Sequence, residues 1–243
     1  GQLTAPLRGP VALQADGKLI VSGPMNGGFG LARYTSSGIL DTTFGTNGIA
    51  VAGEDDNFHL VVGDLAVHPD GKIVVVGTQE TWGHVFAAVV ARFNENGTMS
   101  EGYGVQFFDF PDSMQSYLNA VAFQSDGKII VTGYMFPYNE DDCIILGRLT
   151  TGPEPWFDST FGTNGTVVTP IPHVRHGRGA IAIQADDKIV IAGTMTESYG
   201  NLNENLVLAR YTSNGALDTT LGGSGIVITD LGQNEAGNDV AIQ

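Results

Sequence analysis

Four arginines at equivalent positions are the side chains in this sequence best placed to do chemistry. Each sits among large apolar residues on one strand face, as Arg33 does with Phe29 and Leu31, so we expect it to be half buried. A buried guanidinium needs an anionic partner, either a carboxylate of the protein or a bound ligand. Aspartates 8 or 10 residues later supply that carboxylate in three of the four cases, which favours a structural role. The pairs are Arg33 with Asp41, Arg148 with Asp158, and Arg210 with Asp218.

The remaining arginine, Arg92, breaks this pattern because Ser100 stands where the others have an aspartate. Arg92 is therefore the first residue to examine for a ligand contact, or for a substitute acid. The ligand itself is unknown from the sequence.

Metal sites are not predicted. The acidic runs 54–57 and 140–142 lack the alternating ligands, fixed glycine and distal glutamate of a calcium loop, so we expect solvated loop tips. His173 and His176 form an H-x-x-H pair beside arginines and with no evident third ligand, which is a weak zinc signal. We predict no metal and no cofactor.

Catalytic residues are not predicted either. No G-x-S-x-G nucleophile motif occurs, and Cys143 lies in an apolar run just after acidic residues that would raise its pKa. Six aromatic residues lie outside the repeated positions, where they either pack on neighbouring strands or form stacking platforms for a sugar or peptide. They are Trp82, Tyr134, Phe136, Tyr138, Trp156 and Tyr199.

The overall charge limits the possible partners. The 243 residues include 26 acidic and 11 basic side chains, giving a net charge of −15. Such a surface repels nucleic acid and anionic lipid, and eight of the basic residues occupy repeated positions rather than one patch. No stretch is long and apolar enough for a transmembrane helix. The charge is compatible with a soluble protein that is secreted or on the cell surface.

A fourfold internal repeat places these residues. The pattern V-x-L-Q-A-D-G-K-L-I-V-S-G at 11–23 returns at 65–77, 121–133 and 181–193. Its lysines, 54, 56 and 60 residues apart, mark the period. A second block with L-A-R-Y and L-D-T-T-F-G-T-N-G follows each first block, and its later half has drifted at 100–104. The lysines are Lys18, Lys72, Lys128 and Lys188.

Each repeat is expected to form four strands. In repeat one these are 11–14, an apolar second strand, 31–34 and 49–51. The D-G-K segment predicts a type I hairpin turn with a bulge, in which glycine takes a positive φ. Asp187 replaces that glycine in repeat four, at a cost of about 1 kcal/mol. No segment has a helical apolar period. The sequence predicts an all-β protein in which copies cover one another, most simply a β-propeller with four blades of four antiparallel strands.

The repeated motif resembles the delta-60 repeat, a propeller-type repeat found in bacterial and some other proteins. The resemblance covers nearly the whole chain, and repeat two departs from it in the L-D-x-x-F-G half. It implies a propeller, often on an extracellular or surface protein, and no reaction.

The domain organisation follows from the period. We expect one propeller domain over 1–243, with repeats at about 11–64, 65–120, 121–180 and 181–239. Residues 239–243 repeat the first strand. They are expected either to close the ring of a monomer or to add to another molecule in a strand-exchanged homodimer.

The functional expectation is a non-catalytic binding or structural module whose partner is an unknown protein or glycan. The alternative is a carbohydrate-binding or carbohydrate-active propeller, a lectin or a hydrolase. A lectin would repeat its aromatic and polar residues in several copies, whereas the loop aromatics here differ between copies. A hydrolase would gather two or three carboxylates or a metal.

Overall fold

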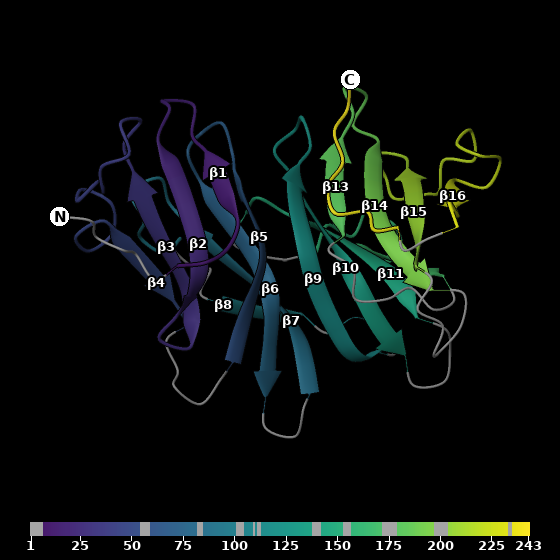
Figure 1. Cartoon of the computed structure of the whole chain (residues 1–243), viewed down its shortest axis with the longest axis horizontal. Coiled ribbons are helices and arrows are strands. Elements are labelled where there is room, and N and C mark those ends of the chain that lie inside the picture. Colours follow the sequence, from purple (N-terminus) through teal and green to yellow (C-terminus); the bar gives the residue numbers. More distant parts are fainter. Residues whose placement is uncertain are drawn as a thin grey trace. The chain divides into compact units, whose positions relative to one another are not determined.

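A computed structural model describes residues 7–53, 59–81, 85–100, 105–108, 110, 113–137, 142–152, 157–171, 179–196, 204–232 and 235–243. The described residues form strands and turns and no helix, which confirms the all-β prediction. No helix suited to crossing a membrane was found among them. The strands form four separate four-stranded antiparallel sheets, one for each repeat (Figure 1).

The chain divides into two compact units, 1–109 and 110–243, each holding two repeats. In the first unit, one sheet has the order β1-β2-β3-β4 and the other β5-β6-β7-β8. Their strands are β1 (Val11–Leu13), β2 (Leu19–Met25), β3 (Gly28–Tyr34), β4 (Ile49–Ala52), β5 (His59–Val67), β6 (Ile73–Thr81), β7 (Val85–Phe93) and β8 (Val105–Phe108).

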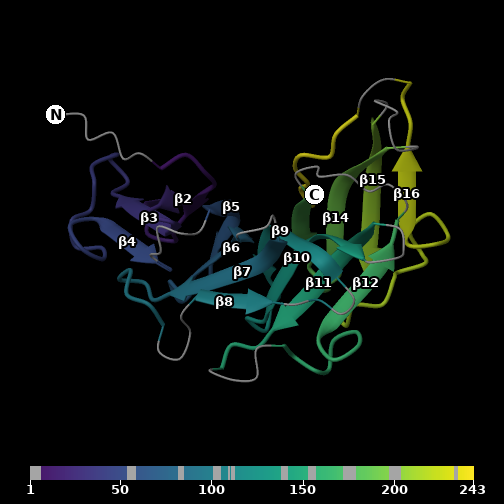
Figure 2. The same ribbon diagram turned by 90° about the horizontal axis from the view of Figure 1, so that it is seen from below.

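The second unit has the same organisation. Its sheets have the orders β9-β10-β11-β12 and β13-β14-β15-β16, and Figure 2 shows both from a second side. Their strands are β9 (Ser113–Phe123), β10 (Ile129–Pro137), β11 (Cys143–Leu149), β12 (Thr166–Pro170), β13 (Ala180–Ile183), β14 (Ile189–Thr196), β15 (Glu204–Tyr211) and β16 (Ile226–Thr229).

Each unit has a core made from both of its sheets. In the first unit, Ile20 and Phe29 of one sheet and Val75 of the other are fully buried in one cluster. In the second unit, Leu146 of β11 and Tyr211 of β15 share a cluster. Within each unit, neighbouring repeats therefore cover each other's apolar strands, as the repeat pattern predicts. The single-domain organisation remains a prediction.

The D-G-K turn has the predicted geometry in all four repeats. In repeat one, Gln14 N donates to Lys18 O and Gly17 N to Gln14 O, and Gly17 has a φ of +82°. The Asp16 carboxylate accepts a hydrogen bond from Lys18 N. Asp187, at the glycine position of repeat four, has a φ of +60°, so it does adopt the left-handed conformation.

A repeated glycine in the second strand allows close approach of the first strand in repeats two and three. A Cβ on Gly77 or Gly133 would collide with the carbonyl oxygen of Val61 or Tyr117. The pairing register shifts at these same points, where β5 and β9 each hold an extra residue. The glycine is thus needed for a β-bulge in repeats two and three.

The expected closing strand over 239–243 is not present as a strand in the structure, where these residues have no regular secondary structure. A β-strand is stable only when a neighbouring strand hydrogen-bonds to its backbone. Here the Val240 amide instead donates a local hydrogen bond to the Asp239 carboxylate, 2.8 Å away, and Ile242 is exposed. Strand exchange through this segment remains a prediction.

Candidate functional site

The repeated lysine and arginine share one carboxylate in three repeats. In repeat three, Arg148 Nε and Lys128 Nζ lie 3.0 and 3.2 Å from the same oxygen, Asp158 Oδ2. The antiparallel pairing of β10 with β11 brings the two cations to one end of the sheet, because Ile129 is opposite Leu149. The equivalent triads are Lys18, Arg33 and Asp41 in repeat one, and Lys188, Arg210 and Asp218 in repeat four.

Local hydrogen bonds hold the aspartate of each triad ionised. Thr160 N and Oγ1 both donate to Asp158 Oδ1, at 3.0 and 2.6 Å. Burial by itself raises the pKa of Asp158. The bonds from Thr160 and Lys128 and the charge of Arg148 outweigh it and lower the pKa to about 2. The bonds from Thr43 likewise lower the pKa of Asp41.

In repeats one and three, the arginine of the triad also binds the next repeat. Arg33 Nη1 donates to the Glu95 carbonyl oxygen at 2.7 Å, and Arg148 Nη1 donates to the Ser213 carbonyl oxygen at 2.9 Å. We call this arrangement the repeat clasp. Its donor half is the arginine with the loop that follows its aspartate (41–48 or 158–165). Its acceptor half is the turn after the third strand of the next repeat (94–97 or 212–215).

Backbone and ring contacts complete each clasp. Gly45 N donates to Asn96 O at 2.8 Å, and Gly162 N donates to Asn214 O at 3.0 Å. The fully buried Phe161 ring lies under the Arg148 guanidinium, with 4.9 Å from Cζ to the ring centre. It also packs against Gly215, where a Cβ would come within 2.9 Å of the ring. Phe44 makes the same contacts in the first unit, with Arg33 and Gly97.

The predicted arginine–aspartate pairs are therefore confirmed, and the three arginines serve the scaffold. Arg33 and Arg148 are buried, and their guanidinium groups bond to protein atoms on several sides. The sequence did not reveal the lysine in each triad or the bond to the next repeat. A backbone carbonyl acceptor leaves no trace in side-chain identity, so only the repetition of the lysine hinted at a shared role.

Repeat two differs from the others, as predicted. Arg92 is buried, and Ser100, at the aspartate position, donates through its backbone amide to Arg92 O at 3.1 Å. Lys72 pairs with Asp70 at 2.8 Å, and its side chain is 63% exposed, against 32% for Lys18 and Lys188. Without a clasp aspartate, the Lys72 side chain extends toward solvent. Repeat two is thus where the recurrent charges are arranged differently.

The other predicted positions are only partly within the described residues. Residues 54–57, 140–141, His173 and His176 lie outside them. Asp142 is 4% exposed, so the expectation of a solvated loop tip is wrong for this residue, which directly precedes β11. Its carbonyl oxygen accepts a hydrogen bond from Ile171 N. In the described part of the chain, no three His, Cys, Asp or Glu residues gather where they could hold a metal ion.

The two described members of this aromatic set, Tyr134 and Phe136, lie in strand β10, so their expected place in a loop is wrong, and both pack against the core of the second unit. The Tyr134 ring stacks on Tyr117, with 4.6 Å between ring centres, and Phe136 meets both rings edge-on. Burial raises the pKa of Tyr134. These rings belong to the core of the second unit rather than to an open platform. Cys143 is buried as expected, and the other four aromatics lie outside the described residues.

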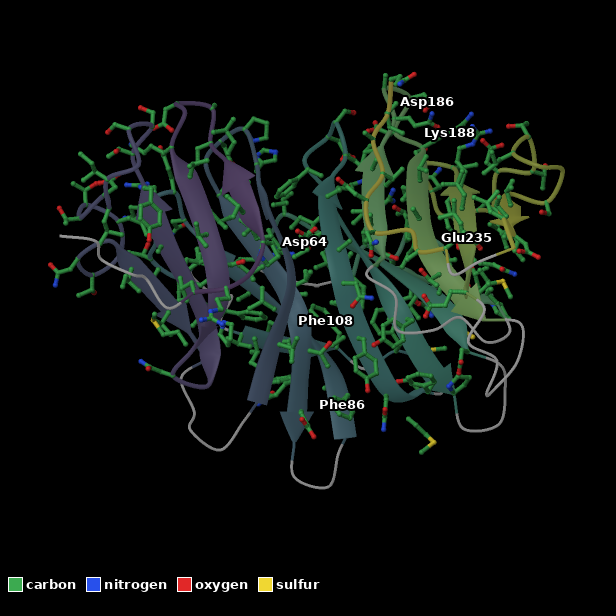
Figure 3. All side chains as sticks on the ribbon, viewed as in Figure 1. Asp64, Phe86, Phe108, Asp186, Lys188 and Glu235 are labelled. Carbon is green, nitrogen blue, oxygen red and sulfur yellow. The ribbon has the colours of Figure 1, made fainter. Side chains whose placement is uncertain are left out.

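A contact between turns was missed by sequence reasoning. The Asp187 carboxylate accepts hydrogen bonds from Ser125 N at 2.7 Å and Ser125 Oγ at 2.5 Å. Asp187 therefore joins the D-G-K turn of repeat four, which Figure 3 marks with Asp186 and Lys188, to the turn of repeat three. The signal was the aspartate itself, standing where the other repeats have glycine.

A small cavity lies between β10 and β14 in the second unit. Its polar lining includes Asn119, Thr132 and Thr194, and its volume is about 30 Å³. That is room for a water molecule rather than an organic ligand.

Comparison with known sequences identifies the family. Four segments, 14–44, 68–99, 124–152 and 184–221, match the family described as a domain of unknown function (DUF5122) β-propeller, and together they cover more than half of the chain. The chain belongs to the DUF5122 β-propeller family. Each matched segment begins at or near the D-G-K turn. In repeats one and four it includes the aspartate of the triad, in repeat two it ends just before Ser100, and in repeat three it ends before Asp158. Comparison with curated proteins gave no match.

Solved structures share the fold of this DUF5122 propeller at low sequence identity. A GH43 β-1,3-galactosidase is 10% identical with a TM-score of 0.52, over 86% of this chain and 46% of that protein. Arabinanase Arb43A of Bacillus subtilis is 12% identical (TM-score 0.49; 95% and 84% covered). TolB of Acinetobacter baumannii is 15% identical (TM-score 0.49; 96% and 45%). The chain thus spans just under half the length of the galactosidase and of TolB. At these identities the likeness concerns the fold alone.

Proposed function

We propose that this protein is a non-catalytic β-propeller module that acts by binding or by structural assembly. The supporting observation is that the charged residues that recur in the repeats pair with one another and with the next repeat. In repeats one and three, lysine, arginine and aspartate are engaged with one another, and the arginine bonds to the next repeat. Charged groups that are held in this way join repeats and are not available to a substrate.

Ligand contact is proposed to occur where the repeats differ, and Arg92 is the residue to test first. Repeat two retains both cations of the triad but carries Ser100 in place of the aspartate. The ligand class is a protein or a glycan. We further propose that the repeat is of the delta-60 type, and that the protein is secreted or on the cell surface, where its acidic charge of −15 favours solubility.

Hydrolysis assays test the non-catalytic part of the proposal. The purified chain is incubated with arabinan, xylan and β-1,3-galactan, chosen because the structural neighbours include an arabinanase, a β-xylosidase and a β-1,3-galactosidase. We expect no reducing ends above the buffer control. Release of sugar that persists through a further purification step would favour the carbohydrate-active alternative.

Binding assays test the second part. The chain is applied to a glycan array and to a peptide array, and any hit is titrated with Arg92→Lys and, as a matched control, Arg8→Lys. Arg8 is exposed and lies outside the repeated pattern. We expect Arg92→Lys to weaken binding at least tenfold while Arg8→Lys leaves it unchanged. Equal effects of the two changes would place the binding site elsewhere.

A further inference from the structure

Asparagine followed by glycine occurs five times in this chain, and one of the five pairs differs from the others in burial. In every pair the asparagine is exposed. The glycine is buried in four pairs and is only half-buried at Gly27. The burial of the glycine, rather than of the asparagine, therefore distinguishes the first pair. The pairs are Asn26-Gly27, Asn47-Gly48, Asn96-Gly97, Asn164-Gly165 and Asn214-Gly215.

The backbone amide of the glycine shows the same division. Gly27 is in the two-residue turn between β2 and β3, and its amide donates no hydrogen bond to the part of the chain that the structure describes. Asn26 and Gly27 both have a positive φ, as in the type I′ turns that Asn-Gly favours. In the other four pairs the glycine amide donates to a carbonyl oxygen of its own loop. These four donors are Gly48, Gly97, Gly165 and Gly215.

We propose that Asn26 is a site of spontaneous modification, at which water converts the side-chain amide to a carboxylate through a cyclic imide. Gly27 N loses its proton to water and attacks Asn26 Cγ. The N–Cγ bond forms, the Cγ–Nδ2 bond breaks, and the side-chain nitrogen leaves as ammonia. Water then opens the ring. Cleavage of the new N–Cγ bond gives aspartate, and cleavage of the bond from Gly27 N to the Asn26 backbone carbonyl carbon gives isoaspartate. No oxidant or reductant takes part.

The pair Asn47-Gly48, in the same repeat, shows why the other sites are protected. Gly48 N donates to Phe44 O at 2.9 Å, and Gly48 is buried beside Leu40. The attacking nitrogen is therefore held away from the asparagine until the loop unfolds locally. The φ of Asn47 is +54°, close to the +51° of Asn26, so the conformation of the asparagine does not explain the difference. We expect Asn47 to react at least tenfold more slowly than Asn26 in the folded chain.

The product changes both the charge and the length of the hairpin turn in repeat one. Either product adds one negative charge beside β2 and β3. Isoaspartate also carries the main chain through its side-chain carbon, which lengthens a turn that joins the paired residues Met25 and Gly28. A Cβ on Gly28 would collide with the Ala52 carbonyl oxygen, so the start of β3 is closely packed against the end of β4. The longer turn therefore disturbs the pairing of Met25 with Gly28.

Two matched variants test the site by a second measurement. Asn26→Gly and Asn47→Gly each remove one asparagine at a positive φ, which glycine adopts without strain. Isoaspartate in the aged chain is measured as methyl transfer from labelled S-adenosylmethionine by an isoaspartyl methyltransferase. We expect Asn26→Gly to abolish most of this methylation and Asn47→Gly to leave it unchanged. Far-ultraviolet circular dichroism checks that both variants are folded. Equal methylation of Asn26→Gly and the unsubstituted chain overturns the proposal.

Peptide mapping compares all five pairs in one chain, because trypsin places each pair in a different peptide. The chain is kept at pH 8 and 37 °C, and amide-to-acid conversion in each peptide is measured by mass spectrometry against the unaged chain. We expect peptide 19–33, which holds Asn26, to convert at least tenfold faster than the other four. In 8 M urea, where the loop contacts are lost, we expect the five rates to agree within threefold. A rate for Asn26 no higher than the others in the folded chain overturns the proposal, and so does a rate advantage that is the same in urea. The other peptides are 34–72, 93–128, 149–175 and 211–243.

Discussion

Removing the carboxylate of one triad is the most direct test of the repeat clasp. In Asp158→Asn, the amide oxygen can still accept the bonds from Thr160, but Arg148 and Lys128 lose their shared counter-charge. Removing one partner of a buried ion pair costs about 3–5 kcal/mol. Arg148 is 3% exposed and keeps its bonds to Ser213 and Thr160, which places the cost at the lower end. Lys128 is more than a third exposed and adds little. We expect the free energy of unfolding of the second unit to fall by about 3 kcal/mol.

The assay needs a probe of the second unit alone. The chain has two tryptophans, Trp82 in the first unit and Trp156 in the second. In a Trp82→Phe background, urea titration followed by Trp156 fluorescence therefore reports on the second unit. The control is Asp126→Asn, because Asp126 also pairs with Lys128, at 3.2 Å, but is half exposed. We expect the control to cost less than about 1 kcal/mol. If Asp158→Asn costs no more than Asp126→Asn, the clasp is not a significant source of stability and the reasoning is refuted.

Three further perturbations test the surrounding structure by the same measurement. Gly133→Ala forces a methyl group into a carbonyl oxygen of β9 and is expected to lower the free energy of unfolding by more than about 2 kcal/mol. Gly193→Ala is the control, because a Cβ at this equivalent position meets nothing within 4 Å, and it should be neutral or slightly stabilising. Equal costs for the two changes would contradict the bulge argument. Asp187→Ala retains the left-handed φ and loses the bonds to Ser125, so it should be about 1 kcal/mol less stable than Asp187→Gly, which is free of that backbone strain. The pKa of Asp158 is about 2 in the folded protein, below its usual 3.8, so its ionisation stabilises the fold above pH 4, and about 2 kcal/mol is lost as the pH falls from 4 to 2. Asp158→Asn should remove that part of the acid sensitivity; a curve with the same slope in both proteins would show that Asp158 is not responsible.

The elements that could be predicted from the sequence are those whose signal lies within one repeat. Strand alternation and the D-G-K turn are local patterns, and four copies of each removed the ambiguity of any single one. The arginine–aspartate pairs were predictable because both partners recur at a near-constant spacing. The triad lysine was not, because Lys128 and Asp158 are 30 residues apart and meet only after the strands pair. The bonds from Arg33 and Arg148 to backbone carbonyls were invisible for the same reason.

Departures from the repeat carried more information than the repeat itself. The sequence predicts Asp187 as a tolerated substitution for glycine with a backbone cost, and in the structure its carboxylate bridges two turns and offsets that cost. Tyr134 and Phe136 lie outside the repeated positions and were candidates for a ligand platform, but they fill core space specific to the second unit. In the case of Asp187 the substitution created a contact between repeats, which a comparison of single repeats does not show.

These contrasts indicate how charges in a tandem repeat should be interpreted. A charged residue that recurs in every copy must satisfy a need that every copy has, and in stacked sheets that need is attachment to the next sheet. The triads of repeats one and three meet it, because each uses one carboxylate to hold two cations and its arginine extends to the following repeat. A ligand, by contrast, needs a charge that the scaffold does not use in the same way. Repeat two carries such charges, because Ser100 replaces the aspartate of the triad and the Lys72 side chain extends to solvent. The experiments on function therefore belong at Arg92.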